Sequence, residues 1–381
     1  MRCTIDKALL TSALARCATI SATRNTMPIL SNVLLTFSPN SLRLVATDLD
    51  LGYETVVETT DCDLEVGEVA VTTIHAKKLH QSVQACPEST VKLSLDTVLQ
   101  VVTLESGTVK FSLSGLDPED FPAPDPVAGE KLTLTGSELS GLLRGVAYAQ
   151  ATDETKYNLT GVYLHVDQGF LTTLTAVATD GHRMGINRLT LPRGANTTPL
   201  FLKGIILPTK AVSALVKVKG DSPVVLNVVT NSVCVSTDNE KFYIRLTDAE
   251  FPWYQRMMVT EHDQTLQFKT LSLVQAVERC RVMSDKDSYG VLITATAEDQ
   301  WVTLVSDLQG VGGHAEDSVA GVVDIKPFSV RLNIAYFLQA LGSMSGNGVD
   351  IICQSSGLAP LQLQGSTGSG PIAIIMPMRA Q

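Results

Sequence analysis

The chain has 381 residues, which at about 100 to 200 residues per domain predicts two to four domains. Hydrophobic residues make up 44% and charged residues 18%, a composition that fits a folded protein and excludes long disordered segments. The formal net charge of −10 would normally argue against nucleic acid binding, because phosphates require local Lys and Arg.

The N-terminal sequence MRCTIDKALLTSALARC lacks the continuous apolar stretch of a signal peptide, and no apolar run approaches the ~20 residues that span a bilayer. We therefore expect a soluble, cytoplasmic protein. Seven cysteines, odd in number and scattered through apolar runs, predict buried thiols rather than disulfides. No CxxC occurs, and His75 and His80 miss the i, i+4 spacing of a helical zinc site, so we expect neither a metal nor a cofactor.

Six helices are predicted, at residues 6–18, 76–86, 137–151, 209–219, 270–286 and 333–345. In the first, the apolar stripe of an amphipathic helix comprises Ile5, Leu9, Ala13, Leu14 and Cys17. The third and fifth repeat this pattern, starting from Leu134 and Phe268. Between the helices, runs such as TVKLSL and TVKFSLSG alternate apolar and polar residues, which predicts antiparallel strands and hairpins.

Internal repetition organises these elements. LDPEDFP at 116–122 recurs as LTDAEFP at 246–252, and Met376-Pro377 is a shorter third copy. Thr47-Asp48, Thr179-Asp180 and Ser306-Asp307 follow similar apolar runs and mark an equivalent turn in each repeat. The sequence therefore predicts an α+β fold of three tandem domains, 1–125, 126–256 and 257–381, each with two helices packed on antiparallel sheet. The segment FPAPDPVAGE reads as the first linker.

Charge is divided unevenly between the helices and the rest of the chain. The six predicted helices hold 11 Lys and Arg against 4 Asp and Glu, so the acidic excess lies elsewhere. Solvated helix faces would explain each lysine singly, whereas helices displayed on a common side would form one basic surface that attracts phosphate.

Residues 178–184, ATDGHRM, place an acid, an imidazole and a guanidinium within four residues. A hydrolase could use Asp180 and His182, but would need a nucleophile brought from elsewhere. The alternative is a turn in which Asp180 accepts backbone N–H groups and Gly181 supplies a positive φ. The sequence contains no G-x-S-x-G, phosphate-binding loop or H-E-x-x-H, and the glycine-rich LQGVGGHAEDS is interpreted as a surface loop.

Four segments carry a family resemblance: TRNTMPILSNVLL at 23–35, ATDGHRM at 178–184, EFPWY at 250–254 and IIMPMR at 374–379. Together they resemble the β subunit of bacterial DNA polymerase III, the sliding-clamp family, and the resemblance covers the whole chain. It implies three clamp-fold domains per chain and two chains closing head to tail into a ring around double-stranded DNA. It also implies that the chain is not an enzyme but a processivity factor, which tethers the replicative polymerase and other replication and repair proteins.

The resemblance assigns ATDGHRM to one wall of a pocket that binds short peptide motifs of the polymerase catalytic subunit, the clamp loader and repair proteins. Apolar and methionine side chains suit such adaptable binding, and rim arginines can hold a peptide's polar groups. The residues assigned to this pocket are Leu159, Thr179, Gly181, His182, Arg183, Met184, Pro252, Arg256, Met257, Leu358, Pro360, Ile374, Met376, Pro377, Met378 and Arg379.

The resemblance also assigns an interface and a DNA-facing surface. The homodimer interface is expected to pair the strand around Lys110 and Phe111 with Val282, Met283 and the loop 309–318 of a second chain. Asp153 introduces negative charge where the family approaches DNA. The residues expected to face DNA are Arg24, Lys77, Lys78, Lys156, Lys210 and Lys217.

Overall fold

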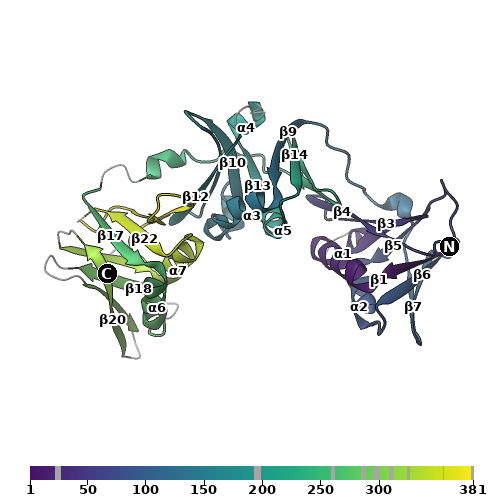
Figure 1. Cartoon of the computed structure of the whole chain (residues 1–381), viewed down its shortest axis with the longest axis horizontal. Helices are drawn as coiled ribbons and strands as arrows, with labels where there is room; N and C mark the ends of the chain where they lie inside the picture. Colours follow the sequence, from purple (N-terminus) through teal and green to yellow (C-terminus); the bar gives the residue numbers. More distant parts are fainter. Residues whose placement is uncertain are drawn as a thin grey trace. The chain divides into compact units, whose positions relative to one another are not determined.

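The computed structural model describes residues 1–21, 27–192, 199–258, 262–284, 289–295, 301–308, 312–323, 327–354 and 356–378. Figure 1 shows the path of the chain, from purple at the N-terminus to yellow at the C-terminus. Its contacts define two compact units. Unit 1 comprises Met1–Thr135 and Asp221–Leu246, and unit 2 comprises Gly136–Gly220 and Thr247–Gln381.

One order of elements occurs three times in the described residues: strand, helix, four strands, helix, three strands. The first repeat comprises β1 (Arg2–Asp6), α1 (Lys7–Ile20), β2 (Asn32–Ser38), β3 (Ser41–Thr47), β4 (Leu51–Glu58), β5 (Ala70–His75), α2 (Ala76–Ala85), β6 (Thr90–Asp96), β7 (Val101–Ser106) and β8 (Val109–Ser114). The second comprises β9 (Glu130–Thr135), α3 (Gly136–Arg144), β10 (Gly161–Gln168), β11 (Thr172–Thr179), β12 (Arg183–Thr190), β13 (Ile205–Pro208), α5 (Thr209–Leu215), β14 (Pro223–Val229), β15 (Ser232–Ser236) and β16 (Glu240–Arg245).

The third repeat comprises β17 (Gln264–Lys269), α6 (Thr270–Arg281), β18 (Gly290–Ala295), β19 (Trp301–Leu308), β20 (Gly313–Val323), β21 (Phe328–Asn333), α7 (Ile334–Ser343), β22 (Gly348–Cys353), β23 (Leu361–Gly365) and β24 (Ile372–Ile375). The second repeat has an additional short helix, α4 (Pro199–Lys203), and short 3₁₀ turns include Ala147–Ala149, Glu154–Lys156 and Tyr254–Met257. The α+β class predicted from the sequence is confirmed.

Unit 1 contains two antiparallel sheets. The larger has eight strands in the order β5-β2-β3-β4-β16-β15-β14-β9, and the smaller has four in the order β1-β6-β7-β8. Strands of the first and second repeats meet where β4 pairs with β16, with Tyr53 opposite Phe242. The larger sheet therefore continues from the first repeat into the second.

Unit 2 contains one sheet of twelve strands, in the order β13-β10-β11-β12-β24-β23-β22-β17-β20-β19-β18-β21. Strands of the second and third repeats meet where β12 pairs with β24, with Met184 opposite Ile374. This junction brings residues about 190 positions apart in the sequence into register.

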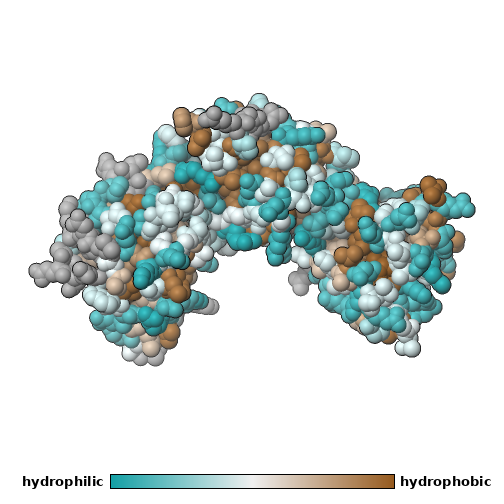
Figure 2. Space-filling view, viewed as in Figure 1, coloured by the Kyte–Doolittle hydropathy of each residue, from teal (hydrophilic) through white to brown (hydrophobic). Residues whose placement is uncertain are grey.

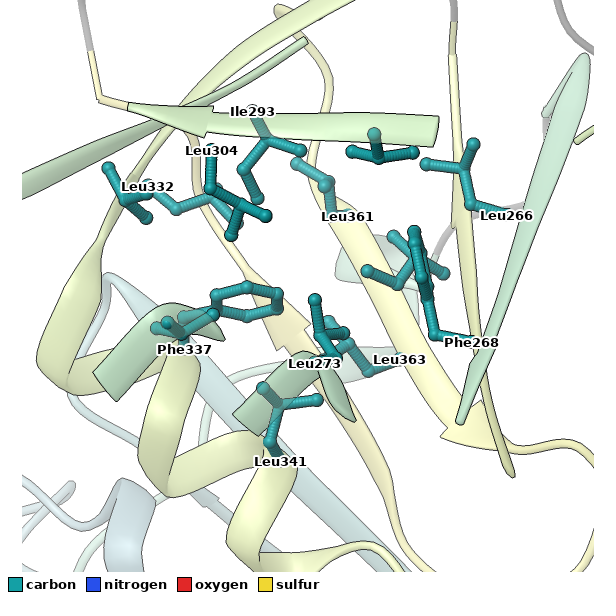
Figure 3. Packing of buried hydrophobic residues seen from close by; sticks show 14 of the residues in the cluster. Leu266, Phe268, Leu273, Ile293, Leu304, Leu332, Phe337, Leu341, Leu361 and Leu363 are labelled. Carbon is teal, nitrogen blue, oxygen red and sulfur yellow. The ribbon is translucent and has the colours of Figure 1, made fainter. Parts of the chain in front are cut away.

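Helices pack in pairs over apolar cores. The third repeat shows this in Figure 3, where Leu273, Phe337 and Leu341 of α6 and α7 pack with Phe268 and Leu363 of the strands. Hydrophilic and neutral residues cover most of the face seen in Figure 2, with apolar residues interspersed. Within the described residues, no helix has the length and apolar character needed to cross a membrane.

Helix bounds differ from the sequence predictions in a regular way. Ile5, Leu134 and Phe268, expected to begin helical stripes, lie in strands β1, β9 and β17. Each of these strands runs directly into a helix. The buried strand residue happens to lie at an apparent helical spacing from the first apolar residues of that helix, so it looked like part of the helical stripe. Leu9 was also predicted to be buried but is 56% exposed.

The predicted helices at 137–151, 209–219 and 270–286 end earlier, at Arg144, Leu215 and Arg281. All seven cysteines are free thiols, six of them buried, as the sequence predicted.

Candidate functional site

The ATDGHRM segment forms a tight turn between β11 and β12. Asp180 Oδ1 accepts the backbone N–H groups of His182 at 2.9 Å and Arg183 at 3.0 Å. Thr179 Oγ1 accepts the N–H of Gly181 at 3.1 Å, and Gly181 has φ +91°. The turn chemistry predicted from the sequence is confirmed, since an acid closes the turn and glycine occupies its left-handed position.

Arg183 is held inside the fold. Its Nε donates to Asp180 Oδ2 at 3.0 Å, and Nη1 donates to Gln339 Oε1 on α7. The guanidinium lies over the ring of Tyr336, 4.2 Å from its centroid, and the side chain is only 9% exposed. Arg183 therefore joins the turn to α7 and is mostly buried.

The hydrolase alternative fails on this geometry. A catalytic triad needs a carboxylate that accepts the imidazole N–H and orients the ring. Both oxygens of Asp180 instead accept N–H groups from the backbone and from Arg183. The carboxylate is thus used to build the turn.

Three residues predicted to line the pocket pack in one apolar cluster, named here the Met184 cluster. Met184 and Ile374 are buried and lie opposite each other where β12 pairs with β24, and Leu159 packs against them partly buried. The other buried members are Val177, Ile186, Ile206, Phe251 and Tyr254. Residues far apart in the sequence, from Leu159 to Ile374, thus contribute to one apolar cluster.

The chain after β24 continues beside the turn. The N–H of Met376 donates to the carbonyl oxygen of His182 at 2.9 Å, and the N–H of Met378 to that of Arg331 at 2.8 Å. Met376, Pro377 and Met378 are half-buried, and the His182 side chain is exposed beside them. Arg379, also assigned to the pocket, lies outside the described residues.

The remaining pocket candidates lie on two other segments. Arg256 and Met257 belong to the Tyr254–Met257 turn, whose Tyr254 packs in the Met184 cluster. The Arg256 guanidinium stacks on Trp253 at 4.2 Å, Met257 is 41% exposed, and Pro252 is exposed.

Leu358 and Pro360 are not members of the Met184 cluster. Leu358 is 84% exposed, and Pro360 directly precedes β23, the neighbour of β24.

Sequence reasoning missed several residues that build this site. Phe251 and Tyr254 lie buried in the cluster. Their motif EFPWY carried part of the family resemblance, but of its residues only Pro252 was assigned to the pocket. His165 and Tyr163 on β10 contact the same segment, as described below. The alternation in GVYLHV predicts a strand but cannot show which residues pack on its face.

Most residues expected to face DNA are exposed lysines. Lys77 and Lys78 lie on α2, Lys210 on α5 and Lys217 just after α5. Lys156 differs, because its Nζ donates to the carbonyl oxygen of Asp180 at 3.2 Å and so belongs to the turn at the apolar site. Arg24 lies outside the described residues.

The expected interface residues lie on strand edges or on exposed chain. Lys110 and Phe111 belong to β8, the last strand of its sheet, and Lys110 pairs with Glu105 at 2.9 Å. Val282 is 73% exposed and Met283 half-buried, just after α6. The prediction of a loop at 309–318 is wrong from Gly313 onward, because residues from Gly313 form strand β20. Residues 309–311 lie outside the described residues.

The chain repeats a pair of helices on antiparallel sheet three times, and the second and third copies together form an apolar site. These features define a clamp-type binding protein. Three family models match the chain in succession: the N-terminal domain of the DNA polymerase III beta subunit over residues 1–125, the central domain over 133–253 and the C-terminal domain over 255–379. The chain belongs to the DNA polymerase III beta subunit family, and it is a DNA sliding clamp with no catalytic role of its own.

Individual relatives and a solved structure support the same family. The Beta sliding clamp of Vibrio cholerae is 29% identical over 385 residues and covers 100% of both chains, and that of Caulobacter vibrioides is 30% identical over 354 residues, 91% of each. The crystal structure of the sliding clamp of Bartonella birtlesii bound to griselimycin superposes with a TM-score of 0.90 at 29% identity, covering 100% of each chain.

Proposed function

We propose that this sliding clamp closes as a head-to-tail homodimeric ring around double-stranded DNA, without sequence preference, in the cytoplasm. Each chain contributes three domains, 1–125, 126–256 and 257–381. The threefold order of elements and the three successive family matches support this division. Continuous sheets across β4–β16 and β12–β24 would hold adjacent domains of one chain together.

Two strand edges support the dimer. Within the described residues, β8 pairs only with β7, and Gly313–Ala320 of β20 pair only with β19. Each edge therefore offers unpaired backbone groups that a second chain can complete. We assign the dimer interface to Lys110 and Phe111 from one chain and Val282 and Met283 from the other.

We further propose that the Met184 cluster and the residues around it bind short peptide motifs of the polymerase catalytic subunit, the clamp loader and other replication and repair proteins. The observation that carries this proposal is the convergence of Leu159, Met184 and Ile374 beside the exposed His182 and the half-buried Met376. Methionine and leucine side chains can adapt to several partners.

A peptide experiment tests the pocket. A synthetic peptide with leucine and phenylalanine anchors should bind with a micromolar Kd, because each buried anchor contributes ~1.5–3 kcal/mol and ordering the peptide offsets part of this. Met376→Glu should abolish binding without changing the dimer mass, since a carboxylate would face apolar anchors. Fluorescence anisotropy measures the affinity, and light scattering measures the mass.

Phe170→Glu provides a matched control. Phe170 lies at the β10–β11 hairpin and is fully exposed, at 101%, outside the Met184 cluster. Its substitution should leave the peptide affinity unchanged. We also expect griselimycin, which the Bartonella birtlesii relative binds, to compete with the peptide. Unchanged peptide affinity in Met376→Glu would remove the pocket assignment.

A further inference from the structure

The segment Phe251–Met258, which carries the Arg256 and Met257 side of the proposed pocket, is fastened to strand β10 by aromatic contacts. Phe251 stacks on Tyr163 with centroids 4.8 Å apart and ring planes 3° from parallel. Tyr163 in turn stacks on His165 at 5.0 Å. His165 Nε2 lies 2.9 Å from the Tyr254 hydroxyl, a buried hydrogen bond across 89 residues of sequence.

The partners of His165 determine which nitrogen carries its proton. Asp167 Oδ1 lies 3.4 Å from Nδ1, and Asp167 Oδ2 accepts the Thr175 hydroxyl at 2.8 Å, which holds the carboxylate in place. Burial, with the Asp167 charge, raises the pKa of Tyr254 to about 12, so its hydroxyl keeps its proton at neutral pH. The arrangement therefore assigns the imidazole proton to Nδ1, facing Asp167, and leaves Nε2 to accept from Tyr254.

Tyr254 transmits this anchor to the pocket. It begins the Tyr254–Met257 turn, and it is a buried member of the same Met184 cluster as Met184 and Ile374. The His165 side chain is itself only 7% exposed, so it is buried beneath the molecular surface. A displaced Tyr254 would move both the cluster and the turn that holds Arg256 and Met257.

We infer that neutral His165 is a positioning residue for peptide binding: through its hydrogen bond to Tyr254 it fixes the Arg256–Met257 wall of the proposed pocket. The inference rests on the proposed pocket and adds to it a residue that no peptide would touch.

Acidification should weaken this anchor. The charged and titratable groups that face His165 are Tyr163 and Asp167 on its own strand, Arg188 on β12, and Tyr254. Burial, assisted by Arg188, lowers the pKa of His165 below its ordinary value near 6.5, although Asp167 opposes this. Once protonated, the imidazole donates from both nitrogens and can no longer accept from Tyr254. Peptide affinity should therefore be constant above pH 6.5 and fall as the pH drops through the lowered pKa.

The experiment uses the full-length clamp and a fluorescein-labelled peptide with leucine and phenylalanine anchors, titrated between pH 5 and 8. At pH 7.5, His165→Leu and Tyr254→Phe should each weaken binding about three- to tenfold, the range expected for one buried hydrogen bond. The double variant should be no weaker than either single one, because both remove the same bond. His165→Gln, whose amide oxygen can accept near the Nε2 position, should restore binding at pH 7.5 and lack the acid step.

Controls separate the possible failures. His182→Gln should retain the acid step, which would exclude the exposed imidazole of the pocket wall as its source. If Met376→Glu leaves the peptide bound, the pocket itself is wrong. If Met376→Glu abolishes binding while His165→Leu and Tyr254→Phe keep wild-type affinity and pH profile, the pocket stands and the positioning role of His165 is refuted.

Discussion

At the scale of single residues, two equivalent turns have the same hydrogen bonds but different residues at positive φ. In the first repeat, Thr47 Oγ1 accepts the N–H of Leu49 at 3.0 Å and Asp48 Oδ1 that of Leu51 at 2.8 Å. Thr179 and Asp180 make the matching bonds in the second. Leu49 has φ +80°, a conformation that costs an L-residue roughly 1–2 kcal/mol and glycine almost nothing.

Leu49→Gly should therefore stabilise the protein. We expect a gain of ~0.5–1 kcal/mol after the greater chain entropy of unfolded glycine is subtracted. The lost side chain should matter little, because Leu49 is 54% exposed. The midpoint of urea unfolding measures the effect, and Gly181→Ala should shift it the opposite way. A lower midpoint for Leu49→Gly would show that the turn is not strained.

The turn was predictable from sequence because the bonds among its own residues join positions at most four apart. The burial of Arg183 was not, because Gln339 and Tyr336 lie more than 150 residues further along the chain. Neither partner has a local signal in the sequence.

At the scale of elements, the threefold order of helices and strands was predictable, while the ends of elements were not. Apolar periodicity cannot locate the residue at which β9 ends and α3 begins, or at which β17 ends and α6 begins, because each strand runs directly into its helix. The glycines of LQGVGGHAEDS predicted a loop, yet the polar residues from His314 to Ser318 form half of a strand pair with β19. Polar residues are compatible with a strand that has an open edge.

The junction of β4 with β16 is stabilised by a nearly buried carboxylate. Glu54 accepts hydrogen bonds from Arg43 at 2.8 Å, Tyr243 at 3.0 Å and Lys241 at 3.3 Å. Burial raises the pKa of Glu54, but its bonds to Arg43 and Tyr243 and the charge of Lys241 outweigh burial and hold the pKa below the ordinary 4.5. The ionised form therefore favours the folded state.

Glu54→Gln should lower the free energy of unfolding by ~1–3 kcal/mol at pH 7, since the partly exposed Arg43 and Lys241 lose their shared acceptor. The wild-type advantage should be constant above pH 4.5 and disappear as the pH falls through the lowered pKa of Glu54. Urea unfolding at a series of pH values measures it. Glu58→Gln, at the exposed end of the same strand, should have little effect at any pH. A pH-independent difference would contradict the ionic role of Glu54.

The open edge of β8 makes a prediction about assembly. Phe111→Asp combined with Met283→Asp should give folded monomers, because charges would face the apolar part of the proposed interface without a partner. Gel filtration with light scattering at micromolar concentration measures the mass, and circular dichroism checks the fold. Val98→Asp, at a turn position that is 89% exposed, should remain dimeric. A monomeric wild type would refute the ring.

At the scale of the whole molecule, fewer basic side chains are available to attract phosphate than the charge of the predicted helices suggested. Arg16 pairs with Glu240, Arg279 with Asp317 and Arg281 with Glu278, so these guanidinium groups are partly neutralised within the chain. Among the lysines of the six predicted helices, Lys77, Lys78, Lys217 and Lys219 are exposed and make no ion pair with any residue that the structure describes. On a chain with a net charge of −10, these few lysines can give only weak, nonspecific attraction to phosphate.

Retention on DNA should therefore be topological rather than electrostatic. A closed ring on circular DNA cannot leave without opening, whatever salt does to its contacts, whereas direct phosphate contacts weaken steeply as salt rises. We expect clamps loaded onto a nicked circle by their loader to survive a moderate-salt wash, and to be lost when one restriction cut gives the DNA free ends. Gel filtration of labelled clamp with DNA measures the bound fraction before and after cutting.

A charge-reversal variant separates loading from retention. Lys210→Glu, Lys217→Glu and Lys219→Glu together should reduce the number of clamps loaded, because approach to phosphate is weakened by like charge. Rings of this variant that do close should stay on uncut circles as long as wild-type rings, since escape requires opening and not the loss of a contact. Equal retention of wild-type clamp on cut and uncut DNA would exclude the topological mechanism, and its attachment would then depend on the lysines alone.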